Sequence, residues 1–125
     1  MLKKISEEGL DENIKLVGFQ NNPYIYMAQS KIFLLTSDWE GYGLVAVEAL
    51  TLGLPCVVSN VGGLPNIVDN FCGKLCINNN EFIDEAQTLL EDNKYYQVKS
   101  KEARNKAKKL NNINEYIKNI NSLYK

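Results

Sequence analysis

The sequence predicts an α/β fold in which a parallel sheet is covered on both faces by helices. Short apolar runs that are typical of buried strands alternate with stretches of good helix formers, and the connections between them are short. Two connections carry closely spaced glycines, Gly41 with Gly43 and Gly62 with Gly63. Since ligands of parallel sheets bind at the carboxyl ends of the strands, turns at that edge are the candidate functional site.

Each expected strand is short, apolar and bounded by polar residues or glycine. The expected strands are residues 14–17, 32–35, 56–59 and 73–77. The turns after the first three of these runs lie on one edge of a parallel sheet. This topology therefore groups Phe19, residues 40–44 and residues 62–63 around one cleft.

The expected helices lie between recognisable start and stop signals. They are residues 2–8, 24–29, 44–52 and 64–68, an amphipathic helix after Asn78, and residues 93–110. Asn78 and Glu81 have the spacing of a capping box, and Pro23 suits a first helical turn. We expect Asn111 and Asn112 to break the last helix, and an apolar stripe follows them. The first helix opens in mid-pattern, which suggests a truncated chain.

Composition predicts one soluble domain in a reducing compartment. The chain has 125 residues, of which 45% are apolar and 23% charged, and its formal net charge is −1. That charge favours neither nucleic acid nor membrane as a partner, and the N-terminus does not resemble a signal peptide. We therefore expect a cytoplasmic location, with Cys56, Cys72 and Cys76 as free thiols.

The chain contains no histidine, which narrows its chemistry. Cys72 and Cys76 have neither a second cysteine pair nor a histidine beside them, so we expect no metal site there. Without histidine, the commonest general base and every Ser-His or Cys-His arrangement are excluded. Catalysis must rest on carboxylates, lysines or backbone donors.

A strand, a glycine turn and a helix start follow one another around residues 32–52. The unpaired N–H groups of a helix N-terminus carry partial positive charge, and glycines let a ligand approach them. This order predicts an anion site, most naturally for phosphate. Glu40 precedes the turn and Glu48 lies about one turn inside an otherwise apolar helix. Glu48 either sits at the wet edge of its helix or, together with Glu40, accepts hydrogen bonds from sugar or ribose hydroxyls.

The stretch Ser37-x-x-Glu40-Gly-Tyr-Gly-Leu-x-x-x-Glu48-Ala resembles the E-x7-E signature of retaining GT-B glycosyltransferases of the family 4 type, also called glycosyl transferases group 1. Residues 17–19, 28–37 and 53–68 resemble its flanking segments in order, and the likeness covers roughly residues 10–90. It implies a three-layer, Rossmann-like parallel sheet forming the C-terminal half of a GT-B fold, incomplete at the N-terminus. Residues 1–125 would be a partial nucleotide-sugar-binding domain with a helical tail from about 93 to 125.

The resemblance also implies roles for individual residues. Glu40 would contact the donor sugar as the catalytic carboxylate, and Glu48 would accept hydrogen bonds from the ribose. The amides of the turn would hold the diphosphate, and the base and ribose edge would meet side chains after the first strand. The diphosphate-binding amides would be those of Gly41, Tyr42, Gly43 and Leu44. The side chains near the base and ribose would be Phe19, Gln20 and Tyr24. The sequence departs from the family pattern at two positions: Asn66 stands where the family has a glutamate, and Tyr42 replaces a phenylalanine.

The implied reaction is transfer of a sugar from a UDP- or GDP-sugar to an acceptor hydroxyl with retained anomeric configuration, in glycan, polysaccharide or glycolipid biosynthesis. It would need no metal or other cofactor, because the helix start neutralises the diphosphate; Asp38-Trp39-Glu40 only mimics the metal motif of GT-A enzymes. The family's assisting Arg and Lys and its N-terminal acceptor domain have no counterpart here. We therefore expect the isolated chain to be inactive.

Two other classes remain open. One is a non-catalytic nucleotide-binding or regulatory module of the same fold. The other is a different GT-B enzyme, although the E-x7-E spacing disfavours an epimerase and residues 41–63 hold no lysine for a pyridoxal-phosphate phosphorylase. The basic run at residues 99–109 is interpreted as a solvated helix face, with peripheral contact to an anionic inner membrane surface as the alternative.

Overall fold

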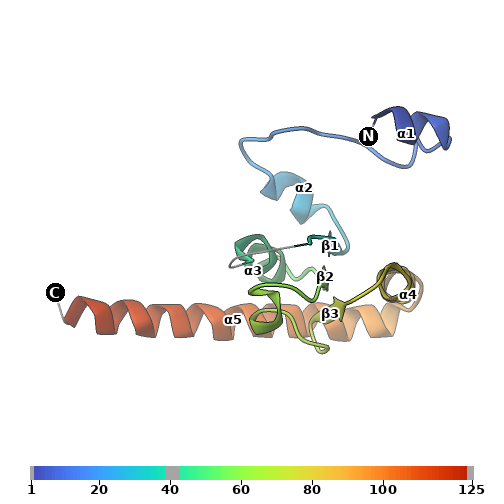
Figure 1. The fold of residues 1–125 in the computed structure, drawn as a ribbon. Helices are drawn as coiled ribbons and strands as arrows, with labels where there is room; N and C mark the ends of the chain where they lie inside the picture. Colours follow the sequence, from blue (N-terminus) through green and yellow to red (C-terminus); the bar gives the residue numbers. More distant parts are fainter. Residues whose placement is uncertain (1, 39–42, 124–125) are drawn as a thin grey trace.

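The computed structural model describes residues 2–38 and 43–123 (Figure 1). The helices are α1 (Leu2–Glu7), α2 (Tyr24–Ala28), α3 (Leu44–Thr51), α4 (Asn79–Glu91) and α5 (Asn93–Leu123), with a short 3-10 helix, η1 (Leu64–Asn66). The strands are β1 (Phe33–Leu35), β2 (Cys56–Ser59) and β3 (Gly73–Cys76). Apart from one strand and one helix end, these elements confirm the predicted ones to within two residues at each end.

The three strands form one parallel sheet in the order β1-β2-β3, as predicted. Phe33 lies opposite Cys56 on one side of β2, and Gly73 lies opposite Cys56 on the other. A side chain at position 73 would collide with the β2 backbone, because a Cβ there would stand 1.9 Å from the Cys56 carbonyl oxygen. Glycine is therefore what lets β3 pair with β2 in this register.

Helices cover both faces of the sheet, which confirms the three-layer prediction. Cys56 and Val58 of β2 pack in a core with α3, η1 and α5, whereas Val57 packs with α4 and the start of α5. Because successive strand residues point to opposite faces, this division follows directly from the apolar run Cys56-Val57-Val58. The long helix α5 runs beneath the strands in Figure 1.

The predicted strand at residues 14–17 is wrong. This segment joins no strand of the sheet in the described chain, and Ile14, Leu16 and Val17 are each about two-fifths exposed. A strand needs a neighbour for its backbone hydrogen bonds, and β1 pairs only with β2 here. In Figure 1, α1 and the segment leading to α2 lie apart from the sheet.

The predicted break at Asn111 and Asn112 is also wrong, since α5 continues without interruption to Leu123. Asparagine lowers helix propensity by only a fraction of a kcal/mol per residue, roughly 0.7 at most. Two asparagines inside a long helix therefore do not stop it, whereas a proline would.

The start of α4 is capped as the sequence indicates. The Asn78 side chain accepts a hydrogen bond from the Glu81 amide at 2.9 Å. The Glu81 carboxylate accepts from the Ile77 amide at 2.6 Å, one residue earlier than in the usual capping box. These bonds fix the chain direction where β3 passes into α4.

A buried polar network ties α4 and α5 to the start of β3 and the segment before it. The Lys99 ammonium donates to the carbonyl oxygens of Asn70 and Gly73 and lies 3.7 Å from the Glu85 carboxylate. Tyr95 donates to the same carboxylate at 2.7 Å, and the Tyr95 pKa is raised to about 12 by burial and by that hydrogen bond. Lys99 is only 8% exposed, so the predicted solvated face is wrong at this position.

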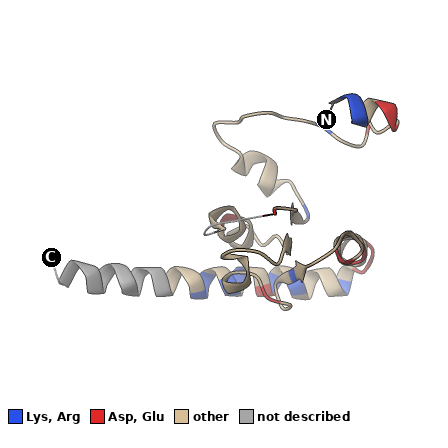
Figure 2. Cartoon of the chain, in the orientation of Figure 1, with Lys and Arg blue, Asp and Glu red and all other residues tan. Residues whose placement is uncertain are grey.

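The remaining basic residues of this run are either exposed or paired with an acidic side chain. Lys101, Arg104, Lys108 and Lys109 are exposed, in agreement with the solvated interpretation. Figure 2 shows in blue how Lys and Arg are distributed along α5. Lys106 instead pairs with Asp69 at 3.4 Å. The helix therefore anchors the η1–β3 connection through two of its basic side chains.

The three cysteines are free, as predicted, and all three are buried. Burial raises the pKa of the Cys56 thiol, and it raises the pKa of Cys72 to about 11. Buried protonated thiols of this kind behave as small apolar side chains rather than as nucleophiles.

Candidate functional site

Helix α3 begins at a glycine in the left-handed conformation. Gly43, the N-cap residue, has φ of 69° and ψ of 35°, and no side chain of the described residues caps this helix start. A Cβ at Gly43 would lie 2.9 Å from Leu64 Cδ2 and 3.1 Å from Ile67 Cδ1. Backbone angle and close packing both favour glycine here, and the first N–H groups of the helix have no partner within the helix.

Glu48 lies on α3 about one turn after that start and is held by a tyrosine from another helix. The Tyr24 hydroxyl, at the start of α2, donates to Glu48 Oε1 at 2.8 Å. Glu48 is half-buried, and the hydrogen bond and its negative charge raise the Tyr24 pKa. The carboxylate is therefore oriented by a partner whose proton is held more tightly than usual.

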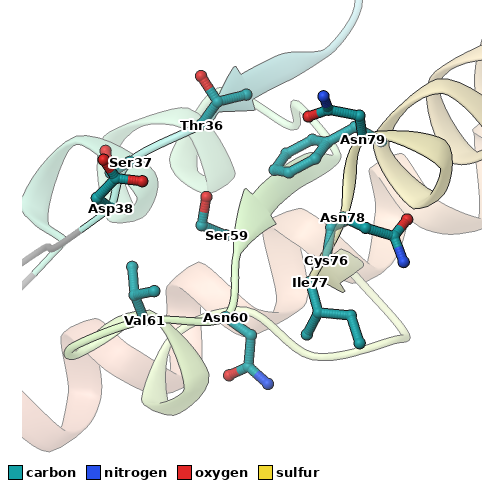
Figure 3. A pocket seen from close by; sticks show the side chains of 11 residues that line it. Thr36, Ser37, Asp38, Ser59, Asn60, Val61, Cys76, Ile77, Asn78 and Asn79 are labelled. Atoms are coloured by element: carbon teal, nitrogen blue, oxygen red, sulfur yellow. The ribbon is translucent and has the colours of Figure 1, made fainter.

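A pocket of about 330 Å³ opens at the carboxyl edge of the sheet. It is lined by residues 36–38 after β1, residues 59–61 from the last residue of β2 onward, residues 76–79 from the last residue of β3 to the first of α4, and Phe82 of α4. In Figure 3 the Ser59 hydroxyl lies between Asp38 on one side and Asn79 on the other. All three strand ends contribute to the pocket, but the cleft predicted at this edge from Phe19, residues 40–44 and residues 62–63 stays a prediction, because none of these is among the described residues that line the pocket.

The structure describes only some of the predicted site residues and brings only part of these together. Gly43, Leu44 and Glu48 lie together on the first turns of α3, where Leu44 is 68% exposed. Glu40, Gly41 and Tyr42, on which the predicted sugar contact and part of the diphosphate contact depend, lie outside the described residues. Their roles stay predictions.

Phe19 and Gln20 do not join this group in the described chain. Phe19 is 91% exposed, and the Gln20 side chain donates to the backbone carbonyl of Val17. No described hydrogen bond links either residue to α3. A role in binding the base stays a prediction for both.

Sequence reasoning missed most of the pocket lining. Thr36, Ser59, Asn60 and Asn79 are not among the predicted site residues, although Ser59 ends a predicted strand and the other three follow one by at most two positions. Two properties could have indicated these residues: their position at the carboxyl end of a predicted strand and their hydrogen-bonding side chains. Tyr24 was a weaker candidate for the base or ribose edge, and its contact with Glu48 was not foreseen.

Neither metal ligands nor a membrane span emerge from the described residues. Residues 2–38 and 43–123 hold no group of three His, Cys, Asp or Glu side chains that could bind a metal ion together. In the same ranges, no helix is both long enough and apolar enough to cross a bilayer.

A parallel sheet with helices on both faces and a pocket at its carboxyl edge is the architecture of α/β proteins that bind ligands at the ends of their strands. Within that class the match is specific. The family described as "Glycosyl transferases group 1" matches residues 1–109. The chain belongs to this family, and its fold is part of a GT-B fold.

Individual relatives agree with the family. The chain is 34% identical over 121 residues to the UDP-Gal:alpha-D-GlcNAc-diphosphoundecaprenol alpha-1,3-galactosyltransferase of Escherichia coli, a match covering 95% of this chain and 31% of that protein. Among solved structures, Anabaena HepE in complex with UDP and glucose superposes with a TM-score of 0.84 at 26% identity, over 97% of this chain and 35% of that one.

A third comparison concerns the fold alone. The C-terminal domain of a glycosyl transferase group 1 family protein from Francisella tularensis superposes with a TM-score of 0.73 at 23% identity, over 86% of this chain and 58% of that one. The chain spans about a third of the length of the curated relatives it matches.

Proposed function

We propose that this chain is the donor-binding part of a retaining glycosyltransferase, with the nucleotide diphosphate held at the start of α3. One observation carries the proposal: a helix start led by a left-handed glycine, which no described side chain caps, stands on the same helix as a carboxylate oriented by Tyr24. The family match and the complexes of HepE with UDP and with UDP-glucose support it.

The start of α3 suits a leaving diphosphate. Negative charge grows on the diphosphate as the bond to the sugar breaks, and fixed N–H groups stabilise such charge without reorganising. Gly43 and Leu44 would supply described backbone donors, with Gly41 and Tyr42 beside them. We infer that these groups take the place of a metal ion and that no cofactor is needed.

Glu48 suits the ribose. Its Oε1 accepts from Tyr24, while Oε2 forms no hydrogen bond with another described residue, so it can accept one from a ribose hydroxyl. Tyr24 would act as a positioning residue that holds the carboxylate in place. Glu40 would contact the sugar itself, as the resemblance implies, and Phe19 and Gln20 would reach the base.

The donor we propose is a UDP-sugar, with a GDP-sugar as the alternative. The name of the E. coli relative includes both UDP-Gal and a diphosphoundecaprenol-linked sugar. By analogy the acceptor of this protein would be a lipid-linked glycan, bound by an acceptor domain outside these 125 residues. The reaction would then take place at the inner face of the membrane, with the exposed basic residues of α5 near its anionic surface.

Isothermal titration of the chain with UDP, GDP and ADP tests the proposal. We expect UDP to bind, equally well with and without EDTA, and Glu48→Gln to weaken it about tenfold or more, since a hydrogen bond to a charged group contributes roughly 1.5–3 kcal/mol. The control is Glu91→Gln, a solvent-exposed carboxylate at the end of α4. Equal affinities of the two variants, or no binding of any nucleotide, would contradict the proposal.

A further inference from the structure

The last turns of α5 run beyond the rest of the domain. Among the described side chains of this helix, Leu110 is the last that packs against the core formed with α3 and η1. The helix continues from there to Leu123, and Figure 1 shows it passing the sheet and the other helices. At 1.5 Å per residue this extension is about 20 Å long. The helix is therefore longer than is needed to cover the sheet.

Local propensity does not explain why this extension is helical. Asparagine is a poor helix former because its side chain competes for backbone hydrogen bonds, and although one such residue costs little, the costs add. The extension contains five of them: Asn111, Asn112, Asn114, Asn119 and Asn121. A helix of low propensity is stable in water mainly when an apolar face packs against a partner. The continuous helix therefore indicates that this segment has one.

The sequence of the extension provides an apolar face. With 3.6 residues per turn, the apolar residues after Leu110 fall within about a third of the helix circumference. They are Ile113, Tyr116, Ile117, Ile120 and Leu123. The opposite face carries asparagine, serine and two charged residues, so the two faces differ sharply in polarity. This pattern is typical of a helix that packs along one side only.

The apolar positions are the same in both directions along the helix. Counted outward from the midpoint of residues 116–117, which are both apolar, Ile113 mirrors Ile120 and Leu110 mirrors Leu123. Two copies of such a helix can lie antiparallel about a two-fold axis with apolar positions opposite one another along the whole contact. Self-complementarity of this kind is what an isologous dimer interface requires.

Charge favours the antiparallel over the parallel arrangement. By helical spacing, Lys109 lies on the same side of α5 as the apolar face, and it is exposed. A parallel pair would bring two copies of this cation together. In an antiparallel pair each Lys109 instead lies near the partner's helix end at Leu123, where free carbonyl groups carry partial negative charge. The charges are therefore complementary in one orientation and repulsive in the other.

We propose that residues 110–123 of α5 pair antiparallel with the same segment of a second copy, so that this chain forms a two-fold symmetric dimer. Two short helices share little contact area, and we therefore expect a reversible dimer with a dissociation constant of roughly 10–500 μM. The dimer is independent of nucleotide binding at α3, so failure of either proposal leaves the other standing.

Sedimentation velocity of the 125-residue chain, from about 5 μM to about 1 mM, tests the dimer. The mass should rise from that of one chain, 14.2 kDa, toward that of two. Ile117→Asp should raise the dissociation constant at least tenfold, because it places a charge at the centre of the apolar face, and Ile120→Asp should act alike. Asn111→Asp is the matched control: it adds the same charge at an exposed position on the opposite face, and should change the constant by less than about twofold.

Cysteine cross-linking determines the orientation. In an equal mixture of Ile113→Cys and Ile120→Cys, oxidised with diamide, the antiparallel pair should give disulfides between the two variants and few within either one. The cysteines of the unchanged chain are buried and should not compete. Disulfides formed mainly within each variant would overturn the antiparallel arrangement.

Two other results would overturn the dimer itself. One is a mass that stays at one chain up to about 1 mM. The other is an equal effect of Ile117→Asp and Asn111→Asp, which would mean that association uses a different surface. If the chain is monomeric and cosediments with phosphatidylglycerol vesicles through the same apolar face, that face binds a membrane surface rather than a second copy.

Discussion

Removing the buried ammonium of Lys99 should be among the most destabilising single changes in this domain. Lys99→Met would leave the Glu85 carboxylate, which is 7% exposed, without its cation. The carbonyls of Asn70 and Gly73 would also lose their donor. Breaking a buried ion pair by removing one partner costs about 3–5 kcal/mol, and we expect a loss of that size in the free energy of unfolding.

The partner substitution should cost less. Glu85→Gln keeps the shape and an acceptor for Tyr95, and Lys99 retains its two carbonyl contacts, so we expect a loss of about 1–3 kcal/mol. In the double variant the unpaired carboxylate is gone. The double variant should therefore lose less free energy of unfolding than the two single variants do together, by about 1–3 kcal/mol.

Urea unfolding followed by far-UV circular dichroism measures all four proteins of this cycle. Lys101→Met is the matched control on the same helix; its side chain is exposed, so the change should stay within about 0.5 kcal/mol. The reasoning is refuted if Lys99→Met behaves like Lys101→Met, or if the two single losses simply add.

Three further predictions concern the site and the core. Gly43→Ala should lower stability by about 1–3 kcal/mol in urea unfolding, because alanine is strained at φ of 69° and its Cβ would press on Leu64; an unchanged midpoint would argue against the left-handed cap. Tyr24→Phe should weaken UDP binding about three- to tenfold in titration calorimetry while leaving the circular dichroism spectrum unchanged, since it frees the Glu48 carboxylate; unaltered affinity would remove the positioning role. Because burial raises the pKa of Cys72 to about 11 while the unfolded thiol ionises near 9, this thiol stabilises the fold below pH 9 and the contribution is lost as pH rises through 11. At pH 10 the free energy of unfolding should be about 1.4 kcal/mol lower than below pH 9 because of this thiol. In urea unfolding, the stability of Cys72→Ala should therefore fall less between these pH values than that of the unchanged protein.

Local sequence patterns were enough to predict helices and strands whose formation depends on residues within the element itself or directly beside it. The run Cys56-Val57-Val58 is apolar throughout because β2 lies between two strands and two helical layers. Start and stop signals for α3 and α4 act within one helical turn, so Gly53 and Asn78 could be identified from the sequence alone.

Features that depend on distant partners could not be predicted in this way. Residues 14–17 have a strand-like composition, but whether they form a strand depends on a neighbour that composition does not show. Lys99 looks like any other member of a basic run, and only packing against Glu85 and Tyr95 makes it a buried residue.

The same distinction between local and distant partners applies to the candidate site. Gly43 and Glu48 could be found because their spacing is a local property of one turn and one helix. The pocket could not, since Asp38, Ser59 and Asn79 come from three strand ends and converge only when the sheet forms. The rule that ligands bind at that edge predicted where to look but not which side chains would line the pocket.

The central claim is that UDP binds at the start of α3. An amide NMR titration of the chain with UDP, carried out in parallel on Glu48→Gln, tests it most directly. The account predicts shifts concentrated on residues 43–48 that need a markedly higher UDP concentration in the variant, with the pocket amides at residues 59–61 and 77–79 little changed. Shifts centred on the pocket instead, or the same titration curve for both proteins, would contradict it.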